Sequence, residues 1–409
     1  TGSQTAGFPF RFVRTQNVDA RRLLASHNNR MHNTHLYAIE YSSNFLLEEA
    51  EGYYFHRHGV SVWQSRFVTI RRTYLNSMKY GTLDCCGDID NRAYGDEAIS
   101  FYGTSDSIIE NVISENQANG FQIHGIASEL APDGQGGRRN QVLGSISIDD
   151  AVPLLISSRA GGPTSYHNAK DNLIENFVAL RPGGNGLFLR GAAGTVIDGV
   201  TLLGSTSNSG FSADDGDSSL GGTCSTSLAC TDTGAACSSN DQCANQKCTK
   251  NPDGCGFTAA NSISANNADY GFSATGQSTA LVEWSNGFGN ADNFIGSEAI
   301  GDSAGMIRNS REQSVSSIGT GTNQCGLWPV AGSPMWNAGK NGVPIGAVIL
   351  HRYQSGTLTT TPLWNPTTGA FPCGASVPGV SDGSIRCSNV HERLNVNRNG
   401  CAFPAAYGN

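Results

Sequence analysis

The chain lacks several features that would place it in a common class of protein. No apolar run approaches the eighteen or so residues that a membrane-spanning helix needs, so we expect no membrane span. Charged residues make up only 15% of the 409 residues, the formal net charge is −8, and no block of basic residues occurs. Phosphate binding needs a concentrated positive surface, so we expect no nucleic-acid partner. No Asn-x-Ser/Thr site with a permitted middle residue occurs, so N-glycosylation is not expected.

Helix-length apolar stripes are also missing, whereas glycine is abundant, with 51 residues. High glycine and low charge are typical of a turn-rich all-β protein, and the length allows one elongated domain. The chain begins with Thr1 rather than Met, so we expect a processed chain whose targeting segment is absent.

Short apolar-alternating segments recur along the chain, and each opens on or just after a small residue. A stacked repeat architecture is indicated, because each copy needs its neighbours to bury its apolar side. The seven copies begin at Gly59-Val60, Ala98-Ile99, Gly120-Phe121, Val152-Pro153, Gly186-Leu187, Gly210-Phe211 and Gly271-Phe272.

Several copies are followed by a second strand after a short turn, as at Phe67–Ile70, and uninterrupted repeats are about 22 to 25 residues long. The phrases Ile-Ile-Glu-Asn-Val at 108–112 and Leu-Ile-Glu-Asn-Phe at 173–177 are also repeated. In these features residues 8 to 310 resemble the right-handed parallel β-helix superfamily of pectate lyases and other polysaccharide-active proteins. The resemblance implies an all-β fold, a single-stranded right-handed parallel β-helix (solenoid), and is specific for fold rather than for reaction.

The expected organisation is a parallel β-helix over residues 1–310, with a cystine-rich insertion at 215–256, and a disulfide-pinned C-terminal cap over residues 311–409. Phe10–Val13 and Leu36–Ile39 are expected strands of one or two irregular first rungs. Three insertions, at about 125–139, 157–170 and 215–254, follow the first strand of their rung. Insertions at one corner of a stacked coil emerge on the same side, so we expect their loops to form a wall beside the surface of the first strands.

Twelve cysteines in so polar a chain indicate an oxidising compartment, secreted or at the cell surface. The insertion has almost no large apolar residues, so we expect disulfides to stabilise it, with fifteen connectivities open. The block contains no His and no Cys-x-x-Cys pair, so zinc is the weaker interpretation. Cys85 and Cys86 could pair with each other or elsewhere. The cysteines expected in disulfides are Cys224, Cys230, Cys237, Cys243, Cys248, Cys255, Cys325, Cys373, Cys387 and Cys401.

Side chains alternate along a strand, so the residues between the predicted inward ones form outward columns. The first outward column is Trp63, Tyr102, His124, Ile156, Arg190, Asp214 and Thr275. The second is Ser61, Ser100, Gln122, Leu154, Phe188, Ser212 and Ser273. Such a groove could stack sugar rings and bind their hydroxyl groups, and the alternative is an ordinary sheet surface.

Two chemistries fit a glycan groove. An eliminase acting on uronates needs a base and a positive group beside the carboxylate. His124 or Tyr102 could be the base, and Arg190 or Arg159 the positive group, with Trp63, Asp214 and Gln122 as further substrate-binding candidates. A hydrolase needs two carboxylates. Asp214-Asp215 is similar to the polygalacturonase pair, but the His precedes it and the Arg-x-Lys signature is missing, so we reject that assignment.

We expect no required cofactor and no metal among the catalytic residues. Ca²⁺ is an alternative at Asp214, Asp215 and Asp217 or at Asp84, Asp88 and Asp90, where carboxylates cluster, although neither set completes a known loop.

Three further polar sets have structural interpretations. The acidic column Glu110, Glu175, Asp198 and Glu283 is expected to accept N–H bonds in turns, with Asn111, Asn176 and Asn309 as an asparagine ladder beside it. The group His56, Arg57, His58, Arg71, Arg72 and Tyr74 is expected to be surface decoration that could extend the groove.

The sequence therefore predicts an extracellular polysaccharide-interacting β-helix, with a lyase acting by β-elimination as the favoured activity. A non-catalytic extracellular scaffold, adhesin or surface-assembly protein, with other surface proteins as partners, is the alternative. Fold by itself does not dictate activity, so enzymatic function stays open.

Overall fold

The structure is a computed structural model of the chain, and parts of it are described here. The described residues are 8–26, 35–55, 57–77, 95–126, 128–131, 134, 136–158, 169–214, 228–230, 236–237, 248–250, 256–274, 279–295, 307–308, 327–329 and 333–364.

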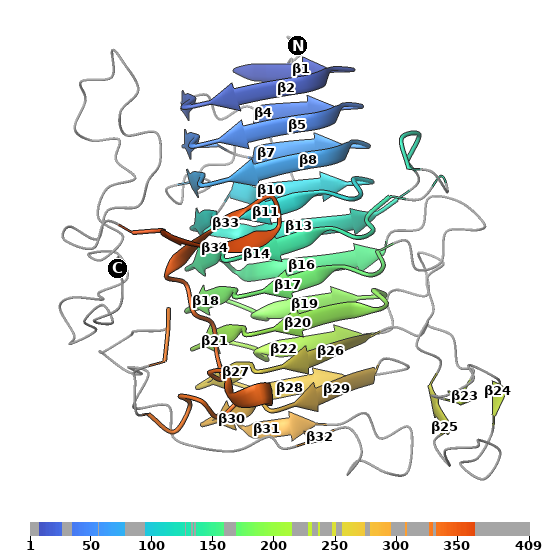
Figure 1. Cartoon of the computed structure of the whole chain (residues 1–409), viewed down its shortest axis with the longest axis vertical. Coiled ribbons are helices and arrows are strands. Elements are labelled where there is room, and N and C mark those ends of the chain that lie inside the picture. The colour runs from blue at the N-terminus through green and yellow to red at the C-terminus, as the bar shows by residue number, and fades with distance from the viewer. Residues whose placement is uncertain are drawn as a thin grey trace, which may run out of the picture.

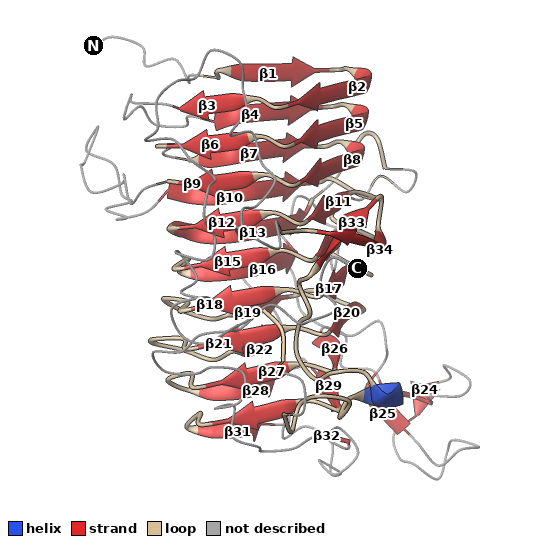
Figure 2. Cartoon of the chain, turned by 60° about the vertical axis from the view of Figure 1, so that its left-hand side comes forward, coloured by secondary structure: helices blue, strands red, loops and turns tan. Residues whose placement is uncertain are grey.

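Three long parallel sheets, which we call A, B and C, are stacked along one axis and confirm the predicted parallel β-helix (Figures 1 and 2). One rung contains one strand of each sheet. Sheet A has the order β1 (Phe10–Val13), β4 (His35–Glu40), β7 (His58–Trp63), β10 (Gly95–Tyr102), β13 (Gln117–Gly125), β16 (Val152–Ser158), β19 (Leu187–Arg190), β22 (Phe211–Asp214), β28 (Tyr270–Ala274) and β31 (Asp292–Ile295). Sheet B has the order β2 (Gln16–Arg21), β5 (Ser43–Glu48), β8 (Arg66–Arg71), β11 (Ile108–Glu110), β14 (Gln141–Leu143), β17 (Leu173–Glu175), β20 (Thr195–Asp198), β26 (Gly256–Ala260), β29 (Thr279–Glu283) and β32 (Ile307–Arg308). Sheet C has the order β3 (Leu24–Ser26), β6 (Glu51–Tyr53), β9 (Tyr74–Asn76), β12 (Ile113–Glu115), β15 (Ile146–Ile148), β18 (Val178–Leu180), β21 (Thr201–Leu203), β27 (Ile263–Ala265) and β30 (Asn286–Phe288).

Two smaller sheets are not paired with sheets A, B and C. A three-stranded antiparallel sheet in the insertion has the order β24 (Ala236–Cys237), β23 (Leu228–Cys230) and β25 (Cys248–Lys250). An antiparallel hairpin joins β33 (His351–Gln354) to β34 (Thr357–Pro362). Within the described ranges the helical structure is one short 3-10 turn, Lys340–Gly342, and no helix there is long and apolar enough to cross a membrane.

The interior of the stack is built from the predicted inward positions. Val60 pairs with Ile99, Ile99 with Phe121, and Leu187 with Phe211, and all of these side chains are fully buried. Aromatic rings stack along the same column, as at Phe211 and Phe272, whose centroids are 4.5 Å apart. Each such side chain contributes about 1.5–3 kcal/mol by leaving water, so the repeated phase of apolar residues stabilises the whole rod.

The corners between sheets are also repeated. At the corner from sheet B to sheet C one residue in each rung has a left-handed backbone, with φ between 50° and 61°. Gly144 is one of these residues, and a Cβ there would also lie 2.7 Å from the Tyr353 ring. At this position glycine therefore satisfies both the turn and the close approach of another segment.

The first two rungs are regular, which corrects the expectation of irregular ones. Strands β1 and β4 pair from Phe10 to Val13, and β2 and β5 pair from Gln16 to Arg21. The predicted insertions at 125–139, 157–170 and 215–254 connect β13 to β14, β16 to β17 and β22 to β26, so all three leave sheet A at its corner with sheet B.

Residues 333–364, which we call the strap, run along the outside of the stack against sheets B and C (Figure 1). Outward apolar residues of sheet C, such as Ile113, Ile146 and Val178, are buried together with Met335, Ile349 and other strap side chains. The outward side of sheet C is therefore apolar where the strap covers it.

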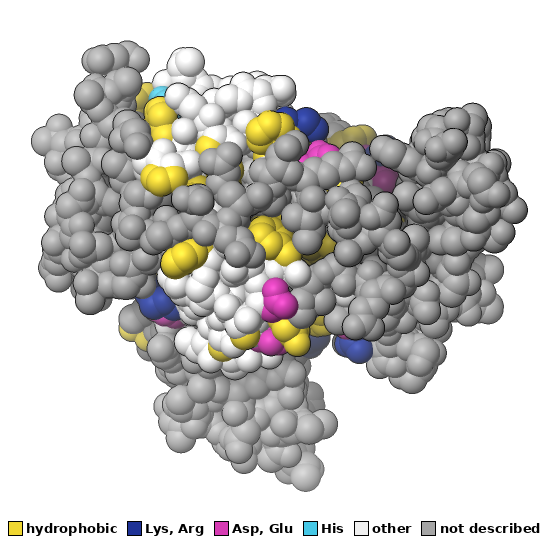
Figure 3. All heavy atoms as spheres, turned by 90° about the horizontal axis from the view of Figure 1, so that it is seen from below, with side chains coloured by type: hydrophobic (Ala, Val, Ile, Leu, Met, Phe, Trp, Pro, Cys, Tyr) yellow, Lys and Arg dark blue, Asp and Glu magenta, His cyan; other side chains and the backbone are white. Residues whose placement is uncertain are grey.

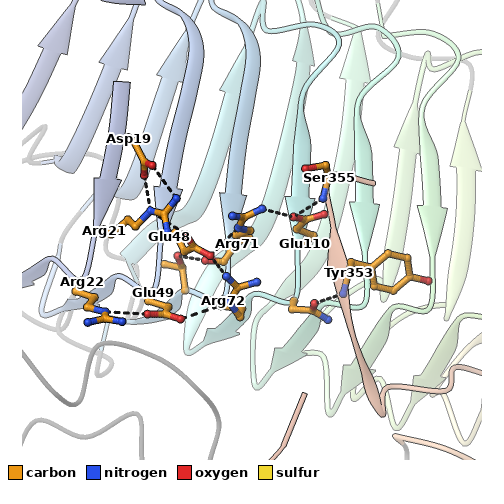
Figure 4. A network of polar contacts seen from close by, with 12 residues as sticks. Asp19, Arg21, Arg22, Glu48, Glu49, Arg71, Arg72, Glu110, Tyr353 and Ser355 are labelled. Atoms are coloured by element: carbon orange, nitrogen blue, oxygen red, sulfur yellow. Dashed lines mark hydrogen bonds and ion pairs between the residues drawn. The ribbon is translucent and has the colours of Figure 1, made fainter. Parts of the chain in front are cut away.

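The strap is held by side chains at the corner between sheets B and C. Glu110 accepts the backbone N–H groups of Ser355 and Gly356, each at 3.0 Å, and Asn111 accepts that of Tyr353 at 2.6 Å (Figure 4). Asn176 accepts the N–H of Val348 at 3.0 Å. The predicted acceptor role of Glu110 is thus met by a distant segment rather than by its own turn. Asn111 and Asn176 bind the strap, and Gly144 stands at the corner position of the rung between them, so these two asparagines do not form a ladder with each other.

Arg71 and Arg72 are also buried, so the prediction of surface decoration is wrong for them. Both guanidinium groups pair with Glu48, and Arg71 lies 3.6 Å from Glu110 (Figure 4). Buried charges are tolerated when they are paired in this way.

The predicted cap falls mostly on residues outside the described ones, and its disulfides remain a prediction. Most of the described part of the C-terminal region is the strap, which lies along the side of the rod. Figure 3 views the molecule from below, at the end nearest β31, where separate apolar side chains lie among backbone and other side-chain atoms on the visible described surface. A cap on this end would cover such side chains.

Candidate functional site

The predicted outward column on sheet A is largely present. Trp63 pairs with Tyr102, and Tyr102 with His124, on β7, β10 and β13. Further along, Arg190 pairs with Asp214 on β19 and β22. Neighbouring strands are about 4.8 Å apart, so these side chains project from one face at that spacing.

The prediction is wrong for β16, where the register differs by one residue. Leu154 pairs with Phe121 and Ile156 with Ile123, and both are fully buried, so neither faces outward. Leu155 and Ser157 take the two outward positions instead. The reason is that Pro153 occupies the place that Gly120 has on β13, so aligning Val152 with that glycine shifted the strand by one residue.

The ring of Tyr102 lies between several other rings of sheet A. It stacks on Trp63 with centroids 5.4 Å apart and lies 4.3 Å from the imidazole of His124. The imidazole of His58 lies 6.1 Å away, also stacked. Trp63 donates from Nε1 to the hydroxyl of Tyr41 at 3.2 Å, which fixes the indole. Tyr102 is therefore a phenol held between two imidazoles.

The two imidazoles have different oxygen partners. Nδ1 of His124 lies 2.6 Å from Oγ of Ser157, which is on the next strand. Nε2 of His58 pairs with the carboxylate of Glu97, also on the next strand. A carboxylate partner favours the charged imidazole, whereas a hydroxyl does not impose a charge.

His35 extends this group toward the first rung. Its ring packs edge-on against His58, with centroids 4.5 Å apart. Burial lowers the pKa of His35 to about 2, and the positive charges of His58, Arg57 and Arg11 lower it further, so this imidazole is neutral.

Sequence reasoning missed His35, Glu97 and Ser157 and placed His58 in a separate surface cluster. His35, His58 and Glu97 are register partners two residues before Tyr37, Val60 and Ile99, where strict alternation would predict inward side chains. The contact of the His58 ring with the outward ring of Tyr102 shows that the alternation does not extend to this edge of the sheet. Extending each repeat by two residues toward its N-terminus would have shown them as a column.

Between the two outward edges lie small polar residues. Ser61, Ser100 and Gln122 form the predicted second column and are almost fully buried. The aromatic and imidazole group is itself buried, with Tyr102 at 9%, His124 at 3% and His58 at 2% exposure. Trp63, Arg190 and Asp214 keep partial exposure, so they are the outer members of the site.

His124 and Arg190 are two strands apart in the same outward position, with Ser157 between them. Their backbones are therefore about 10 Å apart, a span that an arginine side chain and a sugar ring could bridge. Arg159, the other predicted positive group, lies outside the described residues.

Among the residues that the structure describes, no group of three or more His, Cys, Asp or Glu side chains is placed to hold a metal ion. Of the two predicted calcium sets, Asp214 is described and the other aspartates are not. The predicted disulfides are likewise untested. Three of these cysteines lie in the small antiparallel sheet, where Cys230 and Cys248 are register partners.

No protein-family model matches the chain, and no curated protein is significantly similar to it in sequence. The chemistry of the site is therefore argued from its own residues.

Proposed function

We propose that this protein is an extracellular β-helix protein that binds a uronate-containing polysaccharide along the outward face of sheet A and cleaves it by β-elimination. The observation that carries the proposal is the ring of Tyr102 beside the imidazole of His124, 4.3 Å away on the adjacent strand, with Arg190 further along the same column. In this arrangement a base and a positive group face one side of the sheet.

In the proposed reaction, His124 or Tyr102 removes the proton next to the uronate carboxylate. Arg190 stabilises the negative charge that develops on that carboxylate. Trp63 is partly exposed and offers an indole ring for stacking on a sugar, and Asp214 and Gln122 offer groups that bind hydroxyls. Calcium is not needed for these roles.

The experiment is an absorbance assay for the unsaturated product on a panel of uronate polymers. We expect the variant that removes the base, Tyr102→Phe or His124→Gln, to lower the rate by about 10²-fold or more, because the group that takes the proton is lost. Arg190→Met is expected to lower it to a similar extent. His351→Gln, on the strap hairpin, is the matched control and should leave the rate unchanged.

The second candidate is a non-catalytic extracellular scaffold, adhesin or surface-assembly protein. The burial of Tyr102, His124 and His58 favours it, since side chains that pack on one another also serve structure. Absence of product across the panel, together with self-association of the wild-type protein in solution, would select this candidate. We also propose that the cysteines of residues 224–255 form disulfides, which a mass shift on reduction and alkylation tests.

A further inference from the structure

The corner at which sheet A turns into sheet B carries arginine and aromatic side chains in the first three rungs. The turns that join β1 to β2, β4 to β5 and β7 to β8 are stacked there (Figure 1). The residue directly after the sheet A strand is Arg14, Tyr41 or Gln64 in these rungs, and each has a left-handed backbone. Neighbouring rungs are about 4.8 Å apart, so these residues are neighbours along the rod.

Arg14 has an exposed side chain whose guanidinium group lies over the ring of Tyr41, 5.1 Å from its centroid. The other arginines of the first rung are paired with carboxylates, in the pairs Arg11–Glu40, Arg21–Asp19 and Arg22–Glu49. Within the described ranges no carboxylate pairs with Arg14. Arg14 is therefore a positive group that is positioned by a ring and is accessible to an anion from outside.

Tyr41 connects this arginine to the site on sheet A. Its hydroxyl accepts a hydrogen bond from Nε1 of Trp63 at 3.2 Å, and the indole stacks on Tyr102 with centroids 5.4 Å apart. Tyr41 and Trp63 both keep partial exposure. Arg14, Tyr41 and Trp63 thus form a continuous row that begins outside the site and ends at Tyr102.

Phe67 lies on the sheet B side of the same corner, three residues after Gln64, and is 46% exposed. The guanidinium group of Arg66 lies 4.3 Å from its ring centroid, and Arg66 donates from Nε to Asp106 at 2.7 Å. An anchored cation therefore supports one side of the ring, while the ring also reaches solvent. The φ of Phe67 is 56°, a left-handed value that is unfavourable for an aromatic residue.

The fold does not require a phenylalanine at this position. The equivalent residue in other rungs also has a left-handed backbone and is in most cases asparagine, aspartate or glycine, which adopt it readily. These residues are Asn17, Asn44, Asp106, Arg139, Asp171 and Gly194. Backbone strain gathers at ligand-binding positions, so an exposed ring that does not suit its backbone indicates a binding role.

We propose that this corner is a second binding site for the uronate polysaccharide, an inference that rests on the proposed function. Arg14 binds the carboxylate of a sugar outside the sheet A site, and Trp63 and Phe67 stack on sugar rings on the two sides of the corner. The whole chain has a formal net charge of −8, so an anionic polymer needs a local positive group to hold it beside the site.

The test of Arg14 is affinity electrophoresis of the full-length protein in gels that contain polygalacturonate or alginate, each compared with its carboxyl-reduced form. Arg14→Gln is expected to raise the dissociation constant for the uronate polymer about fivefold and to leave binding of the reduced polymer unchanged. Arg11→Gln is the matched control and should bind like wild type, because Arg11 is already paired with Glu40. Wild-type binding by Arg14→Gln, or an equal loss on the reduced polymer, would overturn the role of Arg14.

The test of Phe67 separates binding from stability. Phe67→Asn introduces the residue that Asn44 supplies in the preceding rung, so the melting temperature should stay the same or rise. The dissociation constants for both forms of the polymer should rise about three- to tenfold, because a stacking ring is lost. Val196→Thr, at an apolar position of sheet B that is 47% exposed, is the control and should leave binding unchanged. Unchanged binding by Phe67→Asn, or a lower melting temperature, would refute the role of Phe67.

The outcomes of these tests are distinguishable from those of the absorbance assay. Product formation by a wild-type protein whose binding depends on neither Arg14 nor Phe67 would refute the second site and leave the proposed function intact. Binding that depends on Arg14 and Phe67, without product from any polymer, would refute cleavage and support the second site. A wild-type protein that neither binds nor cleaves any uronate polymer would refute both.

Discussion

The outward faces of sheets A and C begin from the same backbone geometry and end in different environments. In both sheets the outward side chains alternate along the strand with side chains that point into the interior of the stack. Both outward faces contain buried side chains. On sheet A the outward set is aromatic, imidazole and hydroxyl groups, and Tyr102 contacts rings from two strands besides its own. On sheet C the outward residues under the strap are aliphatic, with Ile113, Ile146 and Val178 packed against it.

This difference suits the outward face of sheet C to stabilising the fold and the outward face of sheet A to forming a site. Aliphatic groups on sheet C gain free energy by leaving water, and the strap supplies the surface that buries them. Polar rings on sheet A gain less from burial and require partners such as Ser157 and Glu97. Changes on sheet C should therefore alter mainly stability, whereas changes on sheet A should alter mainly the site.

The largest effect is expected from a charge placed under the strap. Ile146→Asp buries a carboxylate in the apolar contact between β15 and the strap, where Ile146 is 1% exposed, and should cost about 3–5 kcal/mol of unfolding free energy. Urea unfolding followed by circular dichroism measures it. Leu155→Asp, at a half-buried outward position of sheet A, is the matched control and should cost about 1 kcal/mol. Equal losses would show that the two faces do not differ in this way.

A smaller effect is expected from the acceptor that holds the strap. Glu110→Gln weakens the bonds from Ser355 and Gly356 and leaves Arg71 without one of its carboxylates, so it should cost about 2–3 kcal/mol. Hydrogen exchange at these two amides should speed up more than exchange in the sheets. Glu175→Gln, which keeps an acceptor for the Tyr353 hydroxyl, is expected to cost about 1 kcal/mol. An unchanged exchange rate at the amides of residues 355 and 356 would contradict the proposed role of Glu110 in holding the strap.

The turn that joins sheet C to sheet A contains a buried acid, and it predicts a pH dependence. Burial raises the pKa of Asp150 to about 7, although Ser114, Ser147 and the N–H of Gln117 all donate to it. The folded protein therefore binds a proton that the unfolded chain releases near pH 4, so stability should fall as the pH rises from about 4 to about 7.

Asp150→Asn is the test of this dependence. The neutral amide removes the titration, so the pH slope of the unfolding free energy between pH 4 and 7 should flatten relative to wild type. In the wild-type protein, the titration of Asp150 should lower the unfolding free energy by on the order of a few kcal/mol between pH 4 and pH 7. This decrease should be absent from the variant. A slope that is unchanged in the variant would assign the dependence to other groups. Gly120 marks the tightness of this turn, since a Cβ there would lie 2.5 Å from Oδ2 of Asp150.

The smallest effect is expected from an exposed ion pair on sheet A. Arg11 forms a two-bond contact with Glu40 at the first rungs, and the arginine side chain is 50% exposed. Arg11→Gln should cost less than about 1 kcal/mol, and salt should reduce the difference. A loss comparable to that of Glu110→Gln would mean that exposed and buried pairs contribute alike.

The fold was predictable because its signal is local and repeated. Every rung presents apolar residues in one phase, so β7, β10, β13, β19 and β22 could be aligned from sequence alone. The alignment failed at β16, where Pro153 stands in the place of a glycine and the neighbouring leucines fit either phase. The same error hid Ser157, because the outward position beside His124 had been given to Ile156.

The site was predictable only in part. Trp63, Tyr102 and His124 each follow an inward residue directly, so alternation placed them together on the outward face. His58 and Glu97 lie at the opposite edge of that face, and their contact with Tyr102 depends on how far each ring leans across the small residues between them. Alternation gives the face of a side chain but not its distance from others.

By itself the sequence determined that apolar side chains from successive turns meet along one axis, because a period-two pattern repeated at constant phase allows no other common interior. The strap could not be read in this way. Its contacts join residues near 350 to corners near 110 and 176, and such contacts are selected by the surface that the finished stack presents. Tertiary structure likewise decided that one histidine meets a carboxylate and another a hydroxyl, since each partner comes from a neighbouring turn more than thirty residues away.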